Sequence, residues 1–111
     1  MNTSRPFVDI DNISNDLKDI INVIEFKLNK ELTITSGYRS PDHPIEAAKS
    51  SPGEHADGLA VDVYCASPPD FYDLVRVAQE VGVPRIGISR KAGFIHLGIS
   101  KTRSGRTIWV Y

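Results

Sequence analysis

The sequence has little cysteine, no long apolar run and no excess of charge of either sign, and each shortage excludes a class of protein. Its single cysteine, Cys65, cannot form a disulfide within the chain, so the fold must be stabilised by its apolar core or by a bound metal. No apolar run approaches the roughly 18 residues that cross a bilayer. The first residues also lack the charged and then apolar pattern of a secretory signal. We therefore expect no membrane insertion and no signal peptide.

The net charge and the length of the chain restrict the class of protein further. Thirteen Lys and Arg against fourteen Asp and Glu give a formal net charge of -1, which argues against binding nucleic acid over the whole surface and leaves a local basic patch open. A chain of 111 residues is long enough for one domain with a real core. We expect a single domain over residues 1–111, acting as a monomer without a nucleic-acid partner.

Apolar residues recur at helical spacing in two long stretches and alternate in several short ones. Ser14 and Ser67 are well placed as N-caps of the long helices, and Gly82 is well placed to end the second. The order of these elements predicts an α+β fold, with a small, mainly antiparallel sheet and helices packed on one side. The expected helices cover 15–29, 44–49 and the stretch from 68 to Gly82, and the expected strands cover 32–35, 59–64, 85–89, 94–99 and 107–111.

Two histidines and one aspartate occupy unusual places in this pattern. Asp62 lies in the middle of an otherwise apolar strand, where a buried carboxylate needs a cation or a metal as its partner. His96 lies on the polar face of the strand 94–99, so both side chains project from one face if the two strands are neighbours. With His55, just before the first strand, they form a ligand set suited to a catalytic zinc that hydrolyses amides or esters. A histidine is also often a surface or hydrogen-bonded core residue, and spacing alone leaves both interpretations open.

Three motifs resemble a known family in their order along the chain. They are SGYRSP at 36–41, HxxGxAxD at 55–62 and FIH at 94–96. Together they resemble the zinc D-Ala-D-Ala carboxypeptidase and L-alanyl-D-glutamate peptidase family. The closing IWVY at 108–111 is similar to the last strand of small phage-type members.

The resemblance implies a hedgehog/DD-peptidase fold that binds one Zn²⁺ ion through His55, Asp62 and His96. It further implies hydrolysis of peptide bonds in peptidoglycan stem peptides or cross-bridges, as a carboxypeptidase or an endopeptidase. Together with the missing signal peptide, it implies a phage or prophage product that is made in the bacterial cytoplasm and acts on the cell wall, or that is carried in the virion.

Arg39 matches the arginine of the first motif, which implies that it binds substrate or stabilises the oxyanion formed during hydrolysis. A guanidinium offers a planar fork of donors to a carboxylate or a developing oxyanion. Ser36 and His43 are further candidates for contact with the substrate. A serine in this place can instead satisfy loop backbone groups, and a histidine beside Pro44 can simply be solvated.

The chain departs from the family where proton transfer is expected. Members usually carry Glu or Asp three residues before the last histidine, or Asp two residues after it, and this chain has Gly93 and Gly98 there. Glu54 and Asp57 are candidates for the general base, although Glu54 can equally be a solvated loop charge and Asp57 a turn residue. A missing base removes a contribution of about 10²- to 10⁴-fold to the rate. The alternative to a zinc peptidase is therefore a weak or inactive zinc-binding module that binds the cell wall.

Overall fold

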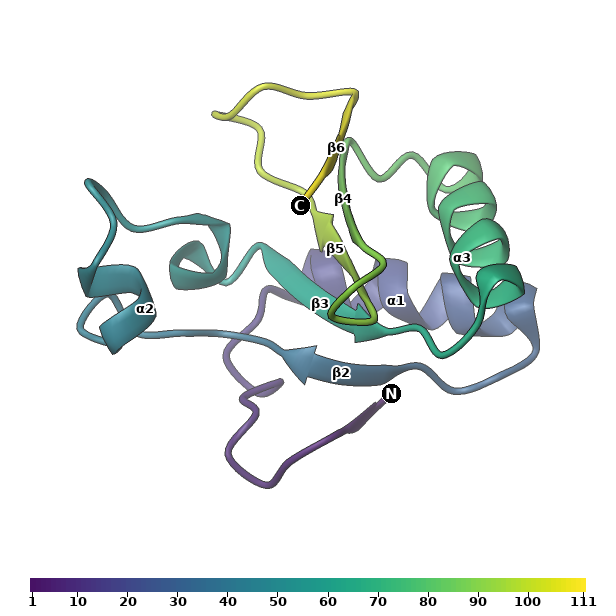
Figure 1. The fold of residues 1–111 in the computed structure, drawn as a ribbon, viewed down its shortest axis with the longest axis horizontal. Coiled ribbons are helices and arrows are strands. Elements are labelled where there is room, and N and C mark those ends of the chain that lie inside the picture. The colour runs from purple at the N-terminus through teal and green to yellow at the C-terminus, as the bar shows by residue number, and fades with distance from the viewer.

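A six-stranded sheet forms the centre of the computed structural model, which describes residues 1–111 (Figure 1). Its strands are β1 (Asn2–Thr3), β2 (Thr33–Ser36), β3 (Ala60–Tyr64), β4 (Arg85–Ser89), β5 (Phe94–Gly98) and β6 (Thr107–Val110), in the order β1-β2-β3-β5-β4-β6. The three central pairings are antiparallel, whereas β1 is parallel to β2 and β6 is parallel to β4. The expected α+β class is confirmed, and the sheet is mixed because both of its edge pairings are parallel.

Two long helices and two short ones connect the strands. They are α1 (Asn15–Leu28), α2 (Pro44–Ala47), the 3-10 helix η1 (Glu54–Asp57) and α3 (Pro68–Glu80). Ser14 caps α1 as expected, because its side chain accepts a hydrogen bond from the backbone N–H of Leu17. At the start of α3 the carboxylate of Asp70 accepts hydrogen bonds from the backbone N–H groups of Ala66 and Ser67. None of these helices has the length and apolar content needed to span a bilayer. The sequence patterns missed β1 and η1.

Alternation along β3 and β5 gives the sheet one apolar and one polar face. Val61 and Val63 of β3 and Ile95 and Leu97 of β5 are fully buried in the core cluster, which also contains the apolar residues of α1 and α3. Figure 1 shows α1 and α3 side by side, and they contact each other, as expected for helices packed on one side of the sheet. The side chains between these apolar positions project to the opposite face, which carries the polar cluster described below.

The last strand covers part of this polar face with a tryptophan. Trp109 of β6 lies opposite Gly87 of β4 in the parallel pairing. A Cβ atom added at Gly87 would lie 2.6 Å from the indole ring, closer than carbon atoms can approach without displacement. The absence of a side chain at Gly87 is therefore what lets Trp109 lie against the sheet.

The variant Gly87→Ala tests this contact. The added methyl group should push the indole away and destabilise the fold by about 1–3 kcal/mol, as overpacking does in other cores. Denaturant unfolding followed by fluorescence reports both effects, because Trp109 is the chain's single tryptophan. Gly105→Ala is the matched control, since its added Cβ meets nothing nearer than 3.8 Å. Equal stability of the two variants would contradict the proposed packing.

Candidate metal centre

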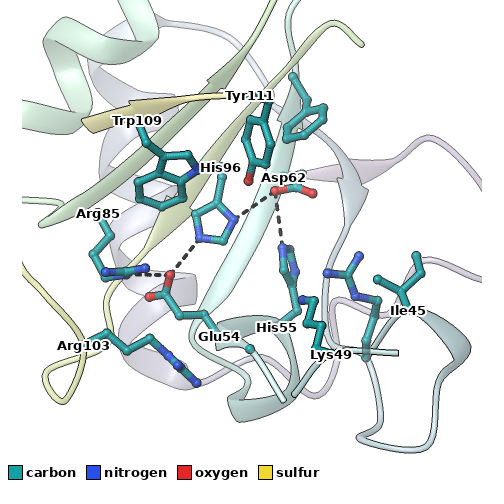
Figure 2. Close-up of a pocket in the computed structure, with 13 residues that line it drawn as sticks. Ile45, Lys49, Glu54, His55, Asp62, Arg85, His96, Arg103, Trp109 and Tyr111 are labelled. Carbon is teal, nitrogen blue, oxygen red and sulfur yellow. Dashed lines mark hydrogen bonds and ion pairs between the residues drawn. The ribbon is translucent and has the colours of Figure 1, made fainter. Parts of the chain in front are cut away.

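Three predicted ligands meet on the polar face of the sheet. The register of β3 and β5 sets Asp62 directly opposite His96, and η1, which precedes β3, brings His55 to the same place. Asp62 Oδ1 lies 3.3 Å from His55 Nε2 and 3.2 Å from His96 Nδ1. Figure 2 shows both rings pointing toward the carboxylate of Asp62. One ligand atom from each residue lies within 4.8 Å of the others, and all three residues are buried.

The geometry of this cluster fits a zinc ion. Ligand atoms bound tetrahedrally at 2.0–2.1 Å lie about 3.3 Å from one another, close to the two distances measured here. Asp62 Oδ1 is buried and has no hydrogen-bond partner, although two ring nitrogens face it. An ionised aspartate is the form of this side chain that binds a metal. The His55, Asp62 and His96 cluster can therefore hold a metal.

Each imidazole is oriented by a bond on its other nitrogen. His55 Nδ1 lies 2.8 Å from the carbonyl oxygen of Gly37, which can only accept, so Nδ1 carries the proton and Nε2 is free. His96 Nε2 lies 2.8 Å from Glu54 Oε1, which leaves Nδ1 free toward Asp62. Such outer partners commonly orient metal-binding histidines. In their neutral forms both rings would present an unprotonated nitrogen to Asp62 Oδ1.

The two candidate bases lie in different surroundings. The side chain of Glu54 is 2% exposed, and its oxygens face His96, the Arg85 guanidinium and the backbone N–H of Ser100. Burial would raise the pKa of Glu54, but these donors lower it to about 2. Asp57 is half exposed, pairs with Arg103 at 3.0 Å and does not line the cleft around the cluster. Neither carboxylate is a free proton acceptor facing the three ligands.

Arg39 lines the same cleft and is held in place by a buried glutamate. Its Nε lies 2.9 Å from Glu46 Oε2, and its Nη1 donates to Ser36 Oγ at 3.1 Å. The side chain of Glu46 is fully buried and also accepts from Lys49 Nζ and from the backbone N–H of Gly53. No sequence pattern indicated this role, because an acidic residue in the first turn of a short helix is ordinarily solvated.

The other predicted contacts lie beside the cleft rather than in it. Ser36 reaches the cleft only through its bond to Arg39, and it lines a neighbouring hollow of about 230 Å³. His43 is exposed at the start of α2, where its Nδ1 accepts from the backbone N–H of Ile45, and it lines the same hollow. Both residues remain predictions as substrate contacts.

The cleft itself has about 410 Å³ and contains residues that the sequence did not single out. Trp109 lies 5.1 Å from the ring of His96, and the guanidinium of Arg85 lies over the same indole. Tyr111 packs against Phe94, so aromatic rings form one side of the cleft (Figure 2). A C-terminal strand rich in aromatic residues was visible in the sequence, but only the parallel pairing of β6 brings it here.

The chain matches a known protein family over most of its length. A family model described as Peptidase M15 matches residues 3–98, which include Arg39 and all three residues of the cluster. The strand β6 lies outside the matched range. No curated protein matches the chain.

The cluster predicts one equivalent of zinc per chain. At free zinc 100-fold above the dissociation constant, binding should stabilise the fold by about 2.7 kcal/mol, which raises the melting temperature by roughly 10 °C. Metal analysis of the purified protein and thermal unfolding with and without a chelator measure these effects. Asp62→Asn should lose most of the zinc-dependent shift, because a carboxamide is a poor zinc ligand. A full shift in this variant would contradict the assignment.

The buried carboxylate of Glu46 should make the stability of the fold depend on pH. Burial would raise its pKa, but hydrogen bonds from Gly53 and Lys49 and the charge of Arg39 lower it to about 2 from 4.5. A depressed carboxyl pKa stabilises the fold above the unfolded value, and this contribution is lost as the pH falls from 4.5 toward about 2. Glu46→Gln should therefore lose about 2–3 kcal/mol at neutral pH and approach wild type in acid.

Urea unfolding of wild type and variant across that pH range measures the difference. Glu80→Gln, which alters an exposed ion pair with Arg76, should change stability by no more than about 0.5 kcal/mol. A difference between Glu46→Gln and wild type that does not change with pH would show that the carboxylate charge is unimportant.

Proposed function

The chain belongs to the peptidase M15 family, and we propose from this that it is a zinc-dependent peptidase acting on peptidoglycan stem peptides or cross-bridges. One observation carries the proposal: Asp62 Oδ1, buried and without a hydrogen bond, faces one nitrogen of each of two imidazoles at 3.2 and 3.3 Å. His55, Asp62 and His96 would hold the metal. Zinc in such a site lowers the pKa of a bound water to about 7 and polarises the carbonyl of the scissile amide.

Arg39 is suited to bind the substrate oxygen that becomes negative. Its Nε and Nη1 are engaged by Glu46 and Ser36, and its Nη2 makes no hydrogen bond within the chain. The guanidinium is therefore oriented before substrate arrives and still has donors to offer. A charged donor held in a fixed place stabilises a developing oxyanion, or a substrate carboxylate, without reorganisation during the reaction.

The charges around the cleft favour an anionic peptide. Four cationic side chains line it against two acidic ones, Glu54 and Asp62, and each of the four cations pairs with a carboxylate of the chain. The stem peptides of peptidoglycan carry free carboxylates, which cationic side chains attract. The four cations are Arg39, Lys49, Arg85 and Arg103.

A second function is favoured by the lack of a free carboxylate in the cleft. Asp62 belongs to the metal cluster and both oxygens of Glu54 face donors, so no carboxylate lining the cleft is left to accept a proton. Position 93, where a base is expected from the resemblance, is a glycine with a positive φ of 78°. A chain that keeps the metal but hydrolyses slowly or not at all would act as a module that binds cell-wall peptides.

Turnover of purified muropeptides decides between the two functions. Wild type should hydrolyse a muropeptide, His96→Ala should lose both zinc and activity, and Arg39→Ala should keep its zinc. Removing one oxyanion donor typically costs about 10²- to 10³-fold in rate, and we expect a loss of this size for Arg39→Ala. Arg76→Ala, which removes an exposed arginine on α3, is the matched control and should keep full activity.

The outcomes separate clearly. Stoichiometric zinc without turnover of any muropeptide would overturn the peptidase and leave the binding module. A protein that binds no divalent metal after purification under mild conditions would overturn both functions.

A further inference from the structure

Glu54 is the buried acidic group in the cleft for which the proposed reaction has no use. We infer that it is a positioning residue, which holds the His96 imidazole in the orientation that binds the metal, and that Gly98 provides the space for it. The inference rests on the proposed metal site, and it gives a role to a residue outside the three ligands.

One short turn serves two of the three ligands. η1 supplies His55 directly, and the preceding residue, Glu54, reaches across to His96, which lies 42 residues away in sequence. The 2.8 Å contact joins Glu54 Oε1 to His96 Nε2, so this nitrogen donates and Nδ1 stays free toward Asp62. A rotation or tautomer change of the ring would remove Nδ1 from the cluster.

Among the three proposed ligands, Glu54 contacts His96 alone. Asp62 contacts His96 at Nδ1 and Glu54 contacts it at Nε2, so the two carboxylates lie at different edges of the ring (Figure 2). Glu54 would therefore affect a bound metal through the His96 imidazole. This distinguishes the inference from a role in proton transfer.

Two hydrogen bonds and one ion pair, from three parts of the chain, hold the Glu54 carboxylate. His96 comes from β5, Arg85 Nε from β4 lies 2.8 Å from Oε1, and the backbone N–H of Ser100 donates to Oε2 at 3.1 Å. The side chain of Arg85 is in turn covered by the Trp109 indole, 5.1 Å from its guanidinium carbon. The carboxylate is thus rigidly held, as a group that orients a ligand needs to be.

Gly98 explains why the carboxylate fits. It follows His96 by two residues in β5, so a side chain there would project from the same face of the sheet. The register sets it between Ala60 of β3 and Arg85 of β4. An added Cβ would overlap both carboxylate oxygens of Glu54 and lie 2.5 Å from its Cδ. The carboxylate of Glu54 therefore occupies the volume that a side chain at position 98 would fill.

The first test replaces the charge and keeps the shape. In Glu54→Gln the side chain keeps a single oxygen. The amide NH₂ group must then face one of the N–H groups that point at the carboxylate in wild type. We expect zinc affinity, measured by competition with a chelator, to fall about 10- to 100-fold, as is typical when an outer partner of a metal-binding histidine is lost. The absorption spectrum of the Co²⁺-loaded protein should change as well, because the His96 ring is no longer fixed.

Glu25→Gln is the matched control for a purely structural effect. Glu25 is also mostly buried and also accepts from a backbone N–H, that of Leu32 at 2.7 Å, but it lies on α1. This variant should lose stability in the metal-free state and keep the wild-type zinc affinity and Co²⁺ spectrum. Thermal unfolding of each metal-free protein shows that the compared chains are folded.

The second test moves the carboxylate to the strand. Gly98→Asp alone should weaken zinc binding, because its side chain and Glu54 compete for one volume. Glu54→Ala alone should weaken it too, whereas the double variant Glu54→Ala/Gly98→Asp should recover most of the affinity. A structural explanation based on lost burial does not predict this recovery.

The results separate this inference from the proposed function. If wild type binds zinc and Glu54→Gln binds it equally tightly, the positioning role is overturned while the metal site stands. If the double variant binds no better than the singles, the role of Gly98 is overturned. If wild type binds no zinc, the proposed function itself has failed.

Discussion

The pairing of β3 with β5 is the constraint on which the site depends. It sets Asp62 opposite His96 on one face and Val61, Val63, Ile95 and Leu97 on the other. A slip of one residue in either strand would turn its apolar side chains to the polar face and remove its ligand from the cluster. The apolar core therefore fixes the arrangement of Asp62 and His96, since the same register serves both. A change in the register of β3 and β5 would therefore alter both the stability of the fold and the geometry of the site.

Three buried carboxylates organise the polar face, and each has cationic or metal-binding partners. Glu46 holds Arg39, Glu54 holds His96 and Arg85, and Asp62 faces the two imidazoles. Buried charge is costly unless it is paired and hydrogen-bonded, so these groups would not persist without their partners. A buried carboxylate with two or three partners also orients the side chains of those partners.

The two glycines at the positions where acidic residues are expected have different structural roles. Gly93 has a positive φ and lies in the turn between β4 and β5, so the backbone conformation there favours glycine. Gly98 has ordinary strand geometry, and its missing side chain leaves the volume that the Glu54 carboxylate occupies. In the sequence, Gly98 looks like the loss of an acidic group. In the folded chain, the carboxylate of Glu54 from η1 lies in nearly the same place.

The sequence by itself indicated most of the elements, through local periodicity, and the proposed ligand set, through three motifs in order. Helical and alternating periodicity located α1, α3 and the five longer strands, and an aspartate inside an apolar strand marked Asp62 as a residue that needs a partner. Only the tertiary structure decided which groups complete the site. Glu46 is buried by α2 and the loop before η1, Glu54 meets His96 across 42 residues, and Trp109 arrives through a parallel edge pairing. Such contacts follow from the path of the whole chain, which no local pattern specifies, and that path decides whether a carboxylate is solvated or positions a metal ligand.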